Sequence, residues 1–439
     1  MHGFYSNQKR LLLLIIFFFL FLIILKTETY SIPAFARKYK TACSTCHIAI
    51  TKRNAVGEAF RRNGYNLPAE IQSMIKDPPL KLGADAWKDT WPDGIWPSSI
   101  PGSVPLAIYS SFSVQNNFEN AVSPKLLLDM PSDLGLLFAG SFGEDIAFFG
   151  SWSIEYGTRM FLRFNNIFNL NNLVNLRVGK FEPGINDSYP GNQRLTMSYT
   201  ILQDYAPAGD WSSKKNNSGF ELNGILNHTI NYQLGIVNSI GYDKFDSFDK
   251  FDYFGRIGFK LGGIALDGSD SKRDTTHFNY SEYNSATLGF FAYYGNSLKP
   301  SANNKTYNNE FRRFGADLKY SFGDLDILGG IMAGSDFKPD TSFERLTSLV
   351  YFGEANYLFY PWLIGILRAE NAFSKNDKTD KDSYTNLIPN LTILIRQNLR
   401  VSLEGLFNFQ HDKNVSGSMI LVDKRESFKN LKIIALIAF

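Results

Sequence analysis

Apolar and polar residues alternate along much of the chain after residue 105. In Arg313–Ser321 and Leu399–Gln410, every second residue is apolar or glycine, and the residues between them are mostly polar or charged. Thr158–Asn165 and Tyr253–Leu261 show the same pattern. Because successive side chains of a β-strand point to opposite faces, this period of two predicts strands with one apolar and one polar face.

The alternating segments and the turn residues between them give sixteen predicted strands. These are 105–118, 133–141, 146–156, 158–165, 172–181, 217–226, 229–239, 251–262, 283–296, 307–321, 324–335, 346–359, 362–374, 385–396, 399–410 and 428–439. Single-chain bacterial outer-membrane barrels have an even number of strands. The strands of a soluble β-sandwich would show the same alternation of apolar and polar residues. The lengths of the connections must therefore distinguish the two folds.

From residue 217 on, short and long connections largely alternate. The short ones are 227–228, 322–323, 360–361 and 397–398, and the long ones include 241–250, 297–306, 336–345, 374–384 and 411–427. Short turns at one end and long loops at the other are typical of membrane barrels. Two connections depart from this rule, the single residue 157 and the long stretch 263–282. We expect a mainly β fold, an outer-membrane barrel of about sixteen strands over 105–439.

The last strand agrees with this interpretation. It ends on Phe439, which resembles the C-terminal signature of outer-membrane barrel proteins, and we expect Ile433 and Ile437 to face outward. The chain is 15% aromatic and only 20% charged, an unusual balance for a soluble protein of this length. Its net charge of +3 gives no indication of a nucleic-acid partner.

The first 31 residues have the order of a secretory signal peptide. Lys9 and Arg10 precede an apolar run of fifteen residues, Leu11–Leu25, which is followed by small and polar residues. A membrane anchor is the alternative, but a spanning helix needs about 20 apolar residues. We expect cleavage after Ser31, with Ala36 as an alternative position. Export fits an outer-membrane location in a Gram-negative-type bacterium.

Residues 43–47, Cys-Ser-Thr-Cys-His, form the c-type haem attachment pattern. The thiols of Cys43 and Cys46 can each form a thioether to a haem vinyl group, and His47 is then placed to ligate the iron. No other cysteine exists in the chain, so none is left for a disulfide. A redox dithiol is the competing interpretation, but it does not require the histidine.

We expect a small helical haem c segment over 32–77. A helix follows the motif and stops at Asn63-Gly64, and a second short helix covers 69–76. Residues 78–104 are rich in proline and tryptophan, which predicts a linker without regular structure. The distal iron ligand is open: Met74 is the only methionine between His47 and the barrel, and a barrel methionine or a vacant position are the alternatives.

The motif and its flanks resemble a known family. Residues 32–37, Ile-Pro-Ala-Phe-Ala-Arg, precede the motif, and 57–65, Gly-Glu-Ala-Phe-Arg-Arg-Asn-Gly-Tyr, follow it. Together with the barrel they resemble the fused monohaem cytochrome c–porin family of bacterial outer membranes, which includes iron(II) oxidases. The resemblance implies one covalent haem c on Cys43 and Cys46, with His47 as proximal ligand. It also implies electron transfer from an extracellular donor such as Fe(II) to a periplasmic carrier such as a soluble c-type cytochrome.

The enzymatic activity that this resemblance implies is that of an iron(II):cytochrome c oxidoreductase. The run 38–41, Lys-Tyr-Lys-Thr, departs from what the iron-oxidising branch leads us to expect, so the donor stays open. Two other functions compete with an electron conduit. One is a diffusion porin whose haem segment gates the pore or senses redox state, and the other is a soluble periplasmic cytochrome with a β-rich domain.

A haem segment of this size is too small for a good core of its own. A sixteen-strand barrel has a lumen wide enough for an aqueous channel, so we expect the segment to plug it. Inward basic residues could meet the haem propionates or form a solvated wall: Arg159, Arg163, Arg177, Arg256, Arg313 and Lys319.

The longest predicted connection, 182–216, follows the fifth strand and should lie on the extracellular side. It carries Glu182, Asp187, Asp204 and Asp210, which could hold iron(II) briefly, since hard cations prefer oxygen ligands. The alternative is a solvated loop or an inward-folded one of the porin type.

Overall fold

The structure is a computed structural model of the full chain, and it describes most of the barrel and part of the N-terminal segment. The described residues are 35, 39, 45–49, 52–66, 80–81, 99–100, 106–118, 124–142, 145–155, 157–170, 172–185, 194–208, 211–239, 250–269, 284–300, 306–339, 344–378, 380–396, 398–414 and 427–438. The chain divides into two compact units, 1–31 and 32–439. Within the described ranges, no helix is both long and apolar enough to cross a membrane.

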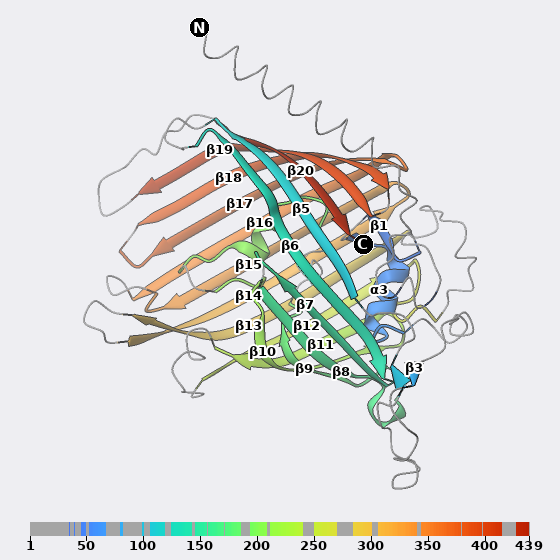
Figure 1. Ribbon diagram of the computed structural model, residues 1–439. Helices are drawn as coiled ribbons and strands as arrows, with labels where there is room; N and C mark the ends of the chain where they lie inside the picture. Colours follow the sequence, from blue (N-terminus) through green and yellow to red (C-terminus); the bar gives the residue numbers. More distant parts are fainter. Residues whose placement is uncertain are drawn as a thin grey trace. The chain divides into compact units, whose positions relative to one another are not determined.

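Sixteen antiparallel strands form a closed barrel (Figure 1). They are β5 (Leu106–Asn117), β6 (Leu126–Phe142), β7 (Ile146–Ser153), β8 (Gly157–Phe164), β9 (Asn175–Phe181), β10 (Asn217–Leu226), β11 (Ile230–Asn238), β12 (Phe251–Leu261), β13 (Ser285–Pro300), β14 (Thr306–Phe322), β15 (Leu325–Phe337), β16 (Arg345–Tyr360), β17 (Leu363–Asn376), β18 (Lys381–Arg396), β19 (Leu399–Asn414) and β20 (Ser427–Ala438). The last strand, β20, pairs with the first, β5, and closes the barrel. The fold and all sixteen predicted strands are confirmed.

The largest boundary difference is in β6, which begins at Leu126 instead of residue 133. Its pairing with β5 shifts register between Ser111 and Ser113, opposite the stretch that contains Pro131. Proline lacks the N–H that a ladder needs, so inside a sheet it is found at such irregularities. A proline predicts an interruption of a strand, so the predicted strand begins only at residue 133, after Pro131.

The alternation separates an apolar outer face from a polar inner one. On β14, Phe314 is 57% exposed and Leu318 is 45% exposed, whereas Arg313 and Asp317 are buried. On β19, Leu403 and Phe407 are exposed, and their neighbours Arg400, Ser402 and Glu404 are buried. Ile433 of β20 pairs with the outward Leu403, as predicted for an outward residue.

Short connections gather at the end of the barrel where β5 begins. They join β10 to β11, β14 to β15, β16 to β17 and β18 to β19, as predicted. The first of these needs the left-handed conformation at Asn227 and His228 (φ 47° and 63°), which asparagine tolerates better than most residues. Both irregular connections also exist: β7 and β8 are joined by 154–156, and β12 and β13 by 262–284.

In the residues that the structure describes, the helix after the motif is shorter than predicted. Strands β1 (His47–Ala49) and β2 (Lys52–Arg53) form a two-stranded pair, and helix α3 (Ala55–Arg62) begins only after them. The predicted stop at Asn63-Gly64 is confirmed, with Gly64 at φ 66°. The second predicted helix, 69–76, lies outside the described residues.

The predicted linker, 78–104, is not wholly irregular. Two-residue strands β3 (Leu80–Lys81) and β4 (Ser99–Ile100) pair within it. Strands this short carry no periodicity, so the sequence could not show them. The tryptophans of the linker lie outside the described residues.

Candidate functional site

Asn54 fastens the cysteine–histidine motif to helix α3. Its backbone N–H donates to the Cys46 carbonyl oxygen (3.0 Å), and its side-chain Nδ2 donates to the Thr45 carbonyl oxygen (3.0 Å). Its Oδ1 accepts from the Gly57 N–H (2.9 Å), so the same residue caps the helix. Asn54 is 5% exposed. One buried side chain therefore sets both the start of α3 and the shape of the motif.

Gly57 allows α3 to lie directly on the motif. A Cβ atom at this position would stand 2.1 Å from the Cys46 carbonyl oxygen. Real Cβ atoms do not approach backbone oxygen so closely, so any larger residue would push the helix away from Cys46.

His47 opens β1 as a half-buried residue with a neutral imidazole. Burial, with a smaller contribution from the positive charge of Arg53, lowers the pKa of His47 to about 4. Within the described residues, its Nδ1 is buried and has no hydrogen-bond partner. A neutral, half-buried imidazole next to a half-buried cysteine fits the donor set of a c-type haem.

A compact ion network stiffens the segment. Glu58 pairs with Arg53 (2.7 Å) and Arg61 (3.0 Å), and its oxygen is 3.8 Å from an Arg62 nitrogen. Burial alone would raise the pKa of Glu58, but the three arginine charges hold it well below its usual range. Glu58 is therefore a carboxylate at neutral pH and joins β2 to the last turn of α3.

On one side, the segment contacts the inner faces of β7 and β8. Arg163 of β8 donates to the carbonyl oxygens of Arg61 (2.8 Å) and Arg62 at the C-terminal end of α3. The last carbonyls of a helix lack partners within the helix, although the Arg61 oxygen also accepts from the Gly64 N–H just beyond it (3.2 Å), and the helix dipole favours a cation at this end. Tyr65 stacks on Phe149 of β7, with ring centroids 5.9 Å apart.

On the other side, the segment contacts β15 and β17. Lys52 forms an ion pair with Asp326 of β15 (2.8 Å), and both side chains are largely buried. Ala49 packs in a buried apolar cluster with Ile364 and Ile366 of β17. In the closed ring of sixteen strands, β7 and β15 lie eight strands apart. The segment therefore crosses the lumen.

The crossing lies at the short-connection end of the barrel. Asp326 and Ile364 are each the second residue of a strand that follows a tight turn. Asn63, which ends α3, donates to the Asp267 carbonyl oxygen and accepts from Asn172. Asp267 and Asn172 both belong to connections at this same end.

The connection between β9 and β10 folds into the lumen, as the inward-folding alternative predicted. It contains helix α6 (Ile201–Asp204), whose residues contact β15, β16 and β17. Glu404 of β19 accepts from the backbone N–H groups of Met197 (2.7 Å) and Ser198 (3.2 Å). Arg368 of β17, fully buried, donates to the hydroxyl oxygens of Thr196 (2.9 Å) and Ser198 (2.8 Å).

The inward connection and the N-terminal segment share one apolar cluster. Leu195 of the connection and Ala49 of β1 both belong to the buried cluster around Ile364 and Ile366, with Ile48 packed against it. The two inserted segments enter from opposite ends of the barrel and meet inside it.

The predicted acidic iron site is not assembled by the described residues. Glu182 is buried 3.7 Å from Arg159, and Asp204 is paired with Lys214. The other two carboxylates, Asp187 and Asp210, lie outside the described residues. In the described part of the chain, no group of three or more His, Cys, Asp or Glu residues could hold a metal ion.

The predicted inward basic residues do line the inner wall, but most have acidic partners. The pairs are Arg159 with Glu182, Arg177 with Glu221, Arg256 with Asp317 and Arg313 with Asp336. Arg163 instead holds α3. Cys43 and Met74 lie outside the described residues, so the first thioether position and the distal ligand stay predictions.

Sequence reasoning missed Asn54, Gly57 and Lys52. Asn54 carried a signal, since asparagine before a helix is a preferred N-cap. Gly57 and Lys52 carried none, because their partners, Cys46 and Asp326, are set by tertiary structure.

No protein-family model matches the chain, and no curated protein matches it. Two similar solved structures are outer-membrane proteins. OmpT of Vibrio cholerae has a TM-score of 0.51 and 11% identity, over 77% of this chain and 98% of that chain. The outer membrane channel DcaP of Acinetobacter baumannii has a TM-score of 0.50 and 12% identity, over 77% of this chain and 97% of that chain. At these identities the likeness shows the barrel fold alone.

Proposed function

We propose that this protein is a haem-bearing, porin-like barrel of the outer membrane that carries electrons between an extracellular donor and a periplasmic carrier. The observation that supports this most is the meeting of two inserted segments inside the lumen. Ala49, two residues after His47, shares a buried cluster with Leu195 of the connection from the opposite end. A redox centre at the motif would thus lie between the two mouths of the barrel.

The membrane location is supported by the outer face of the strands. Large apolar side chains such as Phe314, Tyr351 and Leu367 stand exposed on it. Outer-membrane barrels have such an apolar band, about 25 Å tall, facing lipid. Electrons need a carrier across this band.

The residues that would hold the cofactor are Cys43, Cys46 and His47. A bound haem supplies a one-electron redox centre. Asn54 and Gly57 hold the Cys46 backbone against α3, and burial keeps the His47 imidazole neutral and able to ligate. Lys52 and Arg163 fasten the segment to opposite walls and so fix its position.

We further propose that the donor side is extracellular, with Fe(II) as the candidate donor and a soluble c-type cytochrome as the candidate acceptor. This direction rests on the family resemblance of the motif and its flanks. The inward connection would limit how closely a donor approaches from outside, because it occupies the lumen above the segment.

The test is purification of the full chain from a host with a working c-type maturation system. We expect covalent haem, shown by the mass of the motif peptide, and reduction of that haem by ferrous iron in a spectroscopic redox titration. Cys43→Ala, Cys46→Ala and His47→Ala should each impair haem incorporation or the low-spin spectrum. A correctly matured protein without bound haem would overturn the proposal.

A diffusion porin with a gating or redox-sensing segment is the second candidate. The polar and charged inner wall of the barrel favours this function. A barrel that only insulated a plug would not require such a wall. Liposome swelling separates the two functions: a conduit should admit little solute, and a diffusion porin should admit small sugars freely.

A further inference from the structure

The backbone of Met197, in the inward β9–β10 connection, is fixed to its surroundings. Its N–H donates to Glu404 of β19 (2.7 Å), and its carbonyl oxygen accepts from the Arg194 guanidinium (2.9 Å). The next residue, Ser198, is held by Glu404 and by Arg368 of β17. Because the backbone on both sides of Met197 is anchored, its side chain leaves the connection in a defined direction.

The Met197 sulfur lies against the inner wall of the barrel. Arg400 of β19, which is buried, donates to the Met197 Sδ at 3.8 Å. Its other hydrogen bond among the described residues goes to the Arg194 carbonyl oxygen (3.5 Å). A thioether is only a weak acceptor of hydrogen bonds. The contact with Arg400 uses one lone pair of the sulfur and leaves the second one available.

The sulfur lies at the same depth in the barrel as the N-terminal segment. On the wall, the segment contacts Asp326 of β15 and Ile364 of β17. The Met197 sulfur contacts Arg400 of β19. Each of these wall residues is the second residue of a strand that begins after a tight turn. Since single strands separate β15, β17 and β19 in the ring, the three contacts follow one another along the wall.

The inward connection and the motif also meet through apolar side chains. Leu195, two residues before Met197, shares a buried cluster with Ala49, two residues after His47. The stretch that carries the sulfur therefore packs on the stretch that carries the imidazole.

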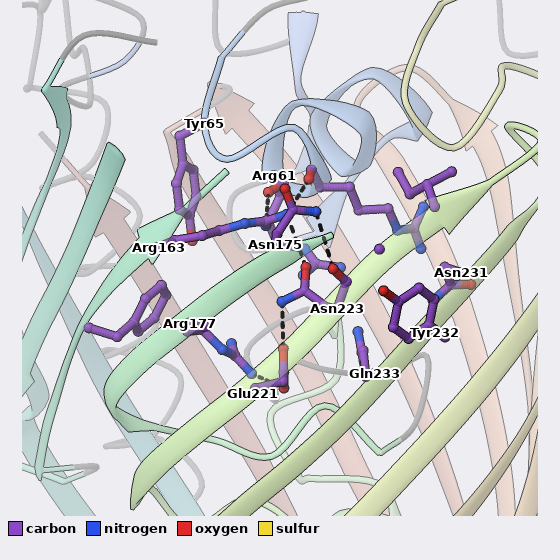
Figure 2. A pocket seen from close by; sticks show the side chains of 14 residues that line it. Arg61, Tyr65, Arg163, Asn175, Arg177, Glu221, Asn223, Asn231, Tyr232 and Gln233 are labelled. Atoms are coloured by element: carbon purple, nitrogen blue, oxygen red, sulfur yellow. Dashed lines mark hydrogen bonds and ion pairs between the residues drawn. The ribbon is translucent and has the colours of Figure 1, made fainter. Parts of the chain in front are cut away.

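The far side of the N-terminal segment is fixed to the opposite wall. Figure 2 shows the last turn of α3 beside β8, where Arg163 reaches the Arg61 carbonyl oxygen (2.8 Å) and the Asn223 side-chain oxygen (3.2 Å). Tyr65, just beyond α3, stacks on Phe149 of β7. The segment is thus held at both ends of its crossing, which sets the position of the motif relative to the inward connection.

The other methionines among the described residues are placed elsewhere. Met130 and Met160 are 51% and 55% exposed. Met332 is buried in a separate apolar cluster, well beyond Asp326 on β15. In the part of the chain that the structure describes, Met197 is therefore the methionine that the fold brings to the motif.

We propose that the Met197 thioether is the distal ligand of the haem iron that His47 ligates from the other side. This inference rests on the proposed function, since it requires the haem. A methionine and a histidine as axial ligands raise the reduction potential of a haem. Arg400 orients the sulfur, as hydrogen-bonding neighbours of metal ligands do. An iron with both axial positions filled takes its electron without binding the donor, so the donor reacts at a distance from the iron.

The test uses the full chain matured with haem, and the absorption spectrum of the oxidised haem is the main readout. Methionine ligation gives ferric haem c a weak sulfur-to-iron charge-transfer band at the red end of the visible spectrum. We expect this band in the unmutated protein and its loss in Met197→Leu. The leucine variant should also have a lower reduction potential and should bind added imidazole, because its distal position is open.

Two further variants separate ligation from packing. Met197→His should give a low-spin haem without the band and with a lower potential than the unmutated protein, because histidine replaces the thioether as ligand. Met332→Leu is the matched control, an inward methionine away from the segment, and should keep the band. Met74→Leu tests the competing ligand, and we expect it to keep the band as well.

Loss of the band in Met197→Leu, with haem content and the circular dichroism of the barrel retained, supports the assignment. The assignment is overturned if the haem-loaded unmutated protein lacks the band, or if the band persists in Met197→Leu or Met197→His. Loss of the band in Met74→Leu with folding retained also overturns it. None of these results affects the proposed function. Absence of covalent haem, measured first from the mass of the motif peptide, overturns both.

Discussion

Two small residues determine how the motif is held, and neither touches a reacting atom. Asn54 and Gly57 act on the backbone of Thr45 and Cys46, so they should affect haem attachment through geometry. Three predictions belong to this scale.

Substitutions of Asn54 should be graded by how many of its two side-chain hydrogen bonds they keep. Asn54→Asp keeps an oxygen that can cap α3 but loses the donor to the Thr45 carbonyl, and Asn54→Ala loses both. An N-cap replaced by alanine costs about 1 kcal/mol. We expect haem content and thermal stability to fall in the order Asn, Asp, Ala. Equal values for Asp and Ala would show that the Thr45 contact, and not the cap, dominates.

Gly57→Ala should impair haem incorporation, although alanine is about 1 kcal/mol better than glycine inside an ordinary helix. The added Cβ would meet the Cys46 carbonyl oxygen at 2.1 Å and displace the motif from α3. Gly353→Ala is the matched control, because a Cβ there meets nothing within 4 Å. Covalent haem per protein is the measurement, and normal loading of Gly57→Ala would contradict the predicted contact.

The Glu58 network should give the segment an acid-sensitive stability. Since the folded-state pKa of Glu58 is depressed, its contribution is fully present above the unfolded value, about pH 4, and is lost as pH falls through the lower folded value. Glu58→Gln should weaken the segment at neutral pH and flatten this acid dependence. The haem absorption spectrum, followed from pH 7 downward, is the readout; identical acid profiles in both proteins would contradict the assignment.

At the scale of elements, the sequence predicted the strands far better than the inserted segments. The period of two is a local property, so all sixteen strands could be predicted, and the largest part of a strand outside the predicted bounds is 126–132 of β6. The inward fold of the β9–β10 connection depends on Glu404 and Arg368, which lie about two hundred residues later. No local sequence pattern distinguishes an inward fold of this connection from a solvated loop. The acidic iron site was predicted on this connection because its inward fold could not be seen in the sequence.

The ion pair between Lys52 and Asp326 should fasten the plug to the wall. Removing one partner of a buried pair leaves an uncompensated charge and costs about 3 kcal/mol or more. Asp326→Asn should therefore loosen the segment and raise ion conductance in planar bilayers. The exchange Lys52→Asp/Asp326→Lys should restore part of the low conductance, and equal conductance in all three proteins would show that the pair does not hold the plug.

At the scale of the whole molecule, the N-terminal segment and the barrel each supply what the other lacks. A segment as short as 32–77 builds only a marginal core of its own, and a sixteen-strand lumen left open would conduct solutes. Contacts on β7–β8 and on β15–β17 hold the segment across the lumen and fix the described part of the motif within it. The motif residues Cys46 and His47 were readable from spacing, whereas the crossing could only be seen in three dimensions.

The central claim, electron transfer through the barrel by a haem at this motif, is tested most directly in proteoliposomes. The full chain is inserted into liposomes that enclose a soluble c-type cytochrome, and iron(II) held by a chelator too large to pass the barrel is added outside. We predict reduction of the enclosed cytochrome by the unmutated protein and loss of that reduction in His47→Ala, with equal insertion of both proteins. Equal rates in the two proteins, or no reduction by a haem-loaded and inserted barrel, would contradict the claim.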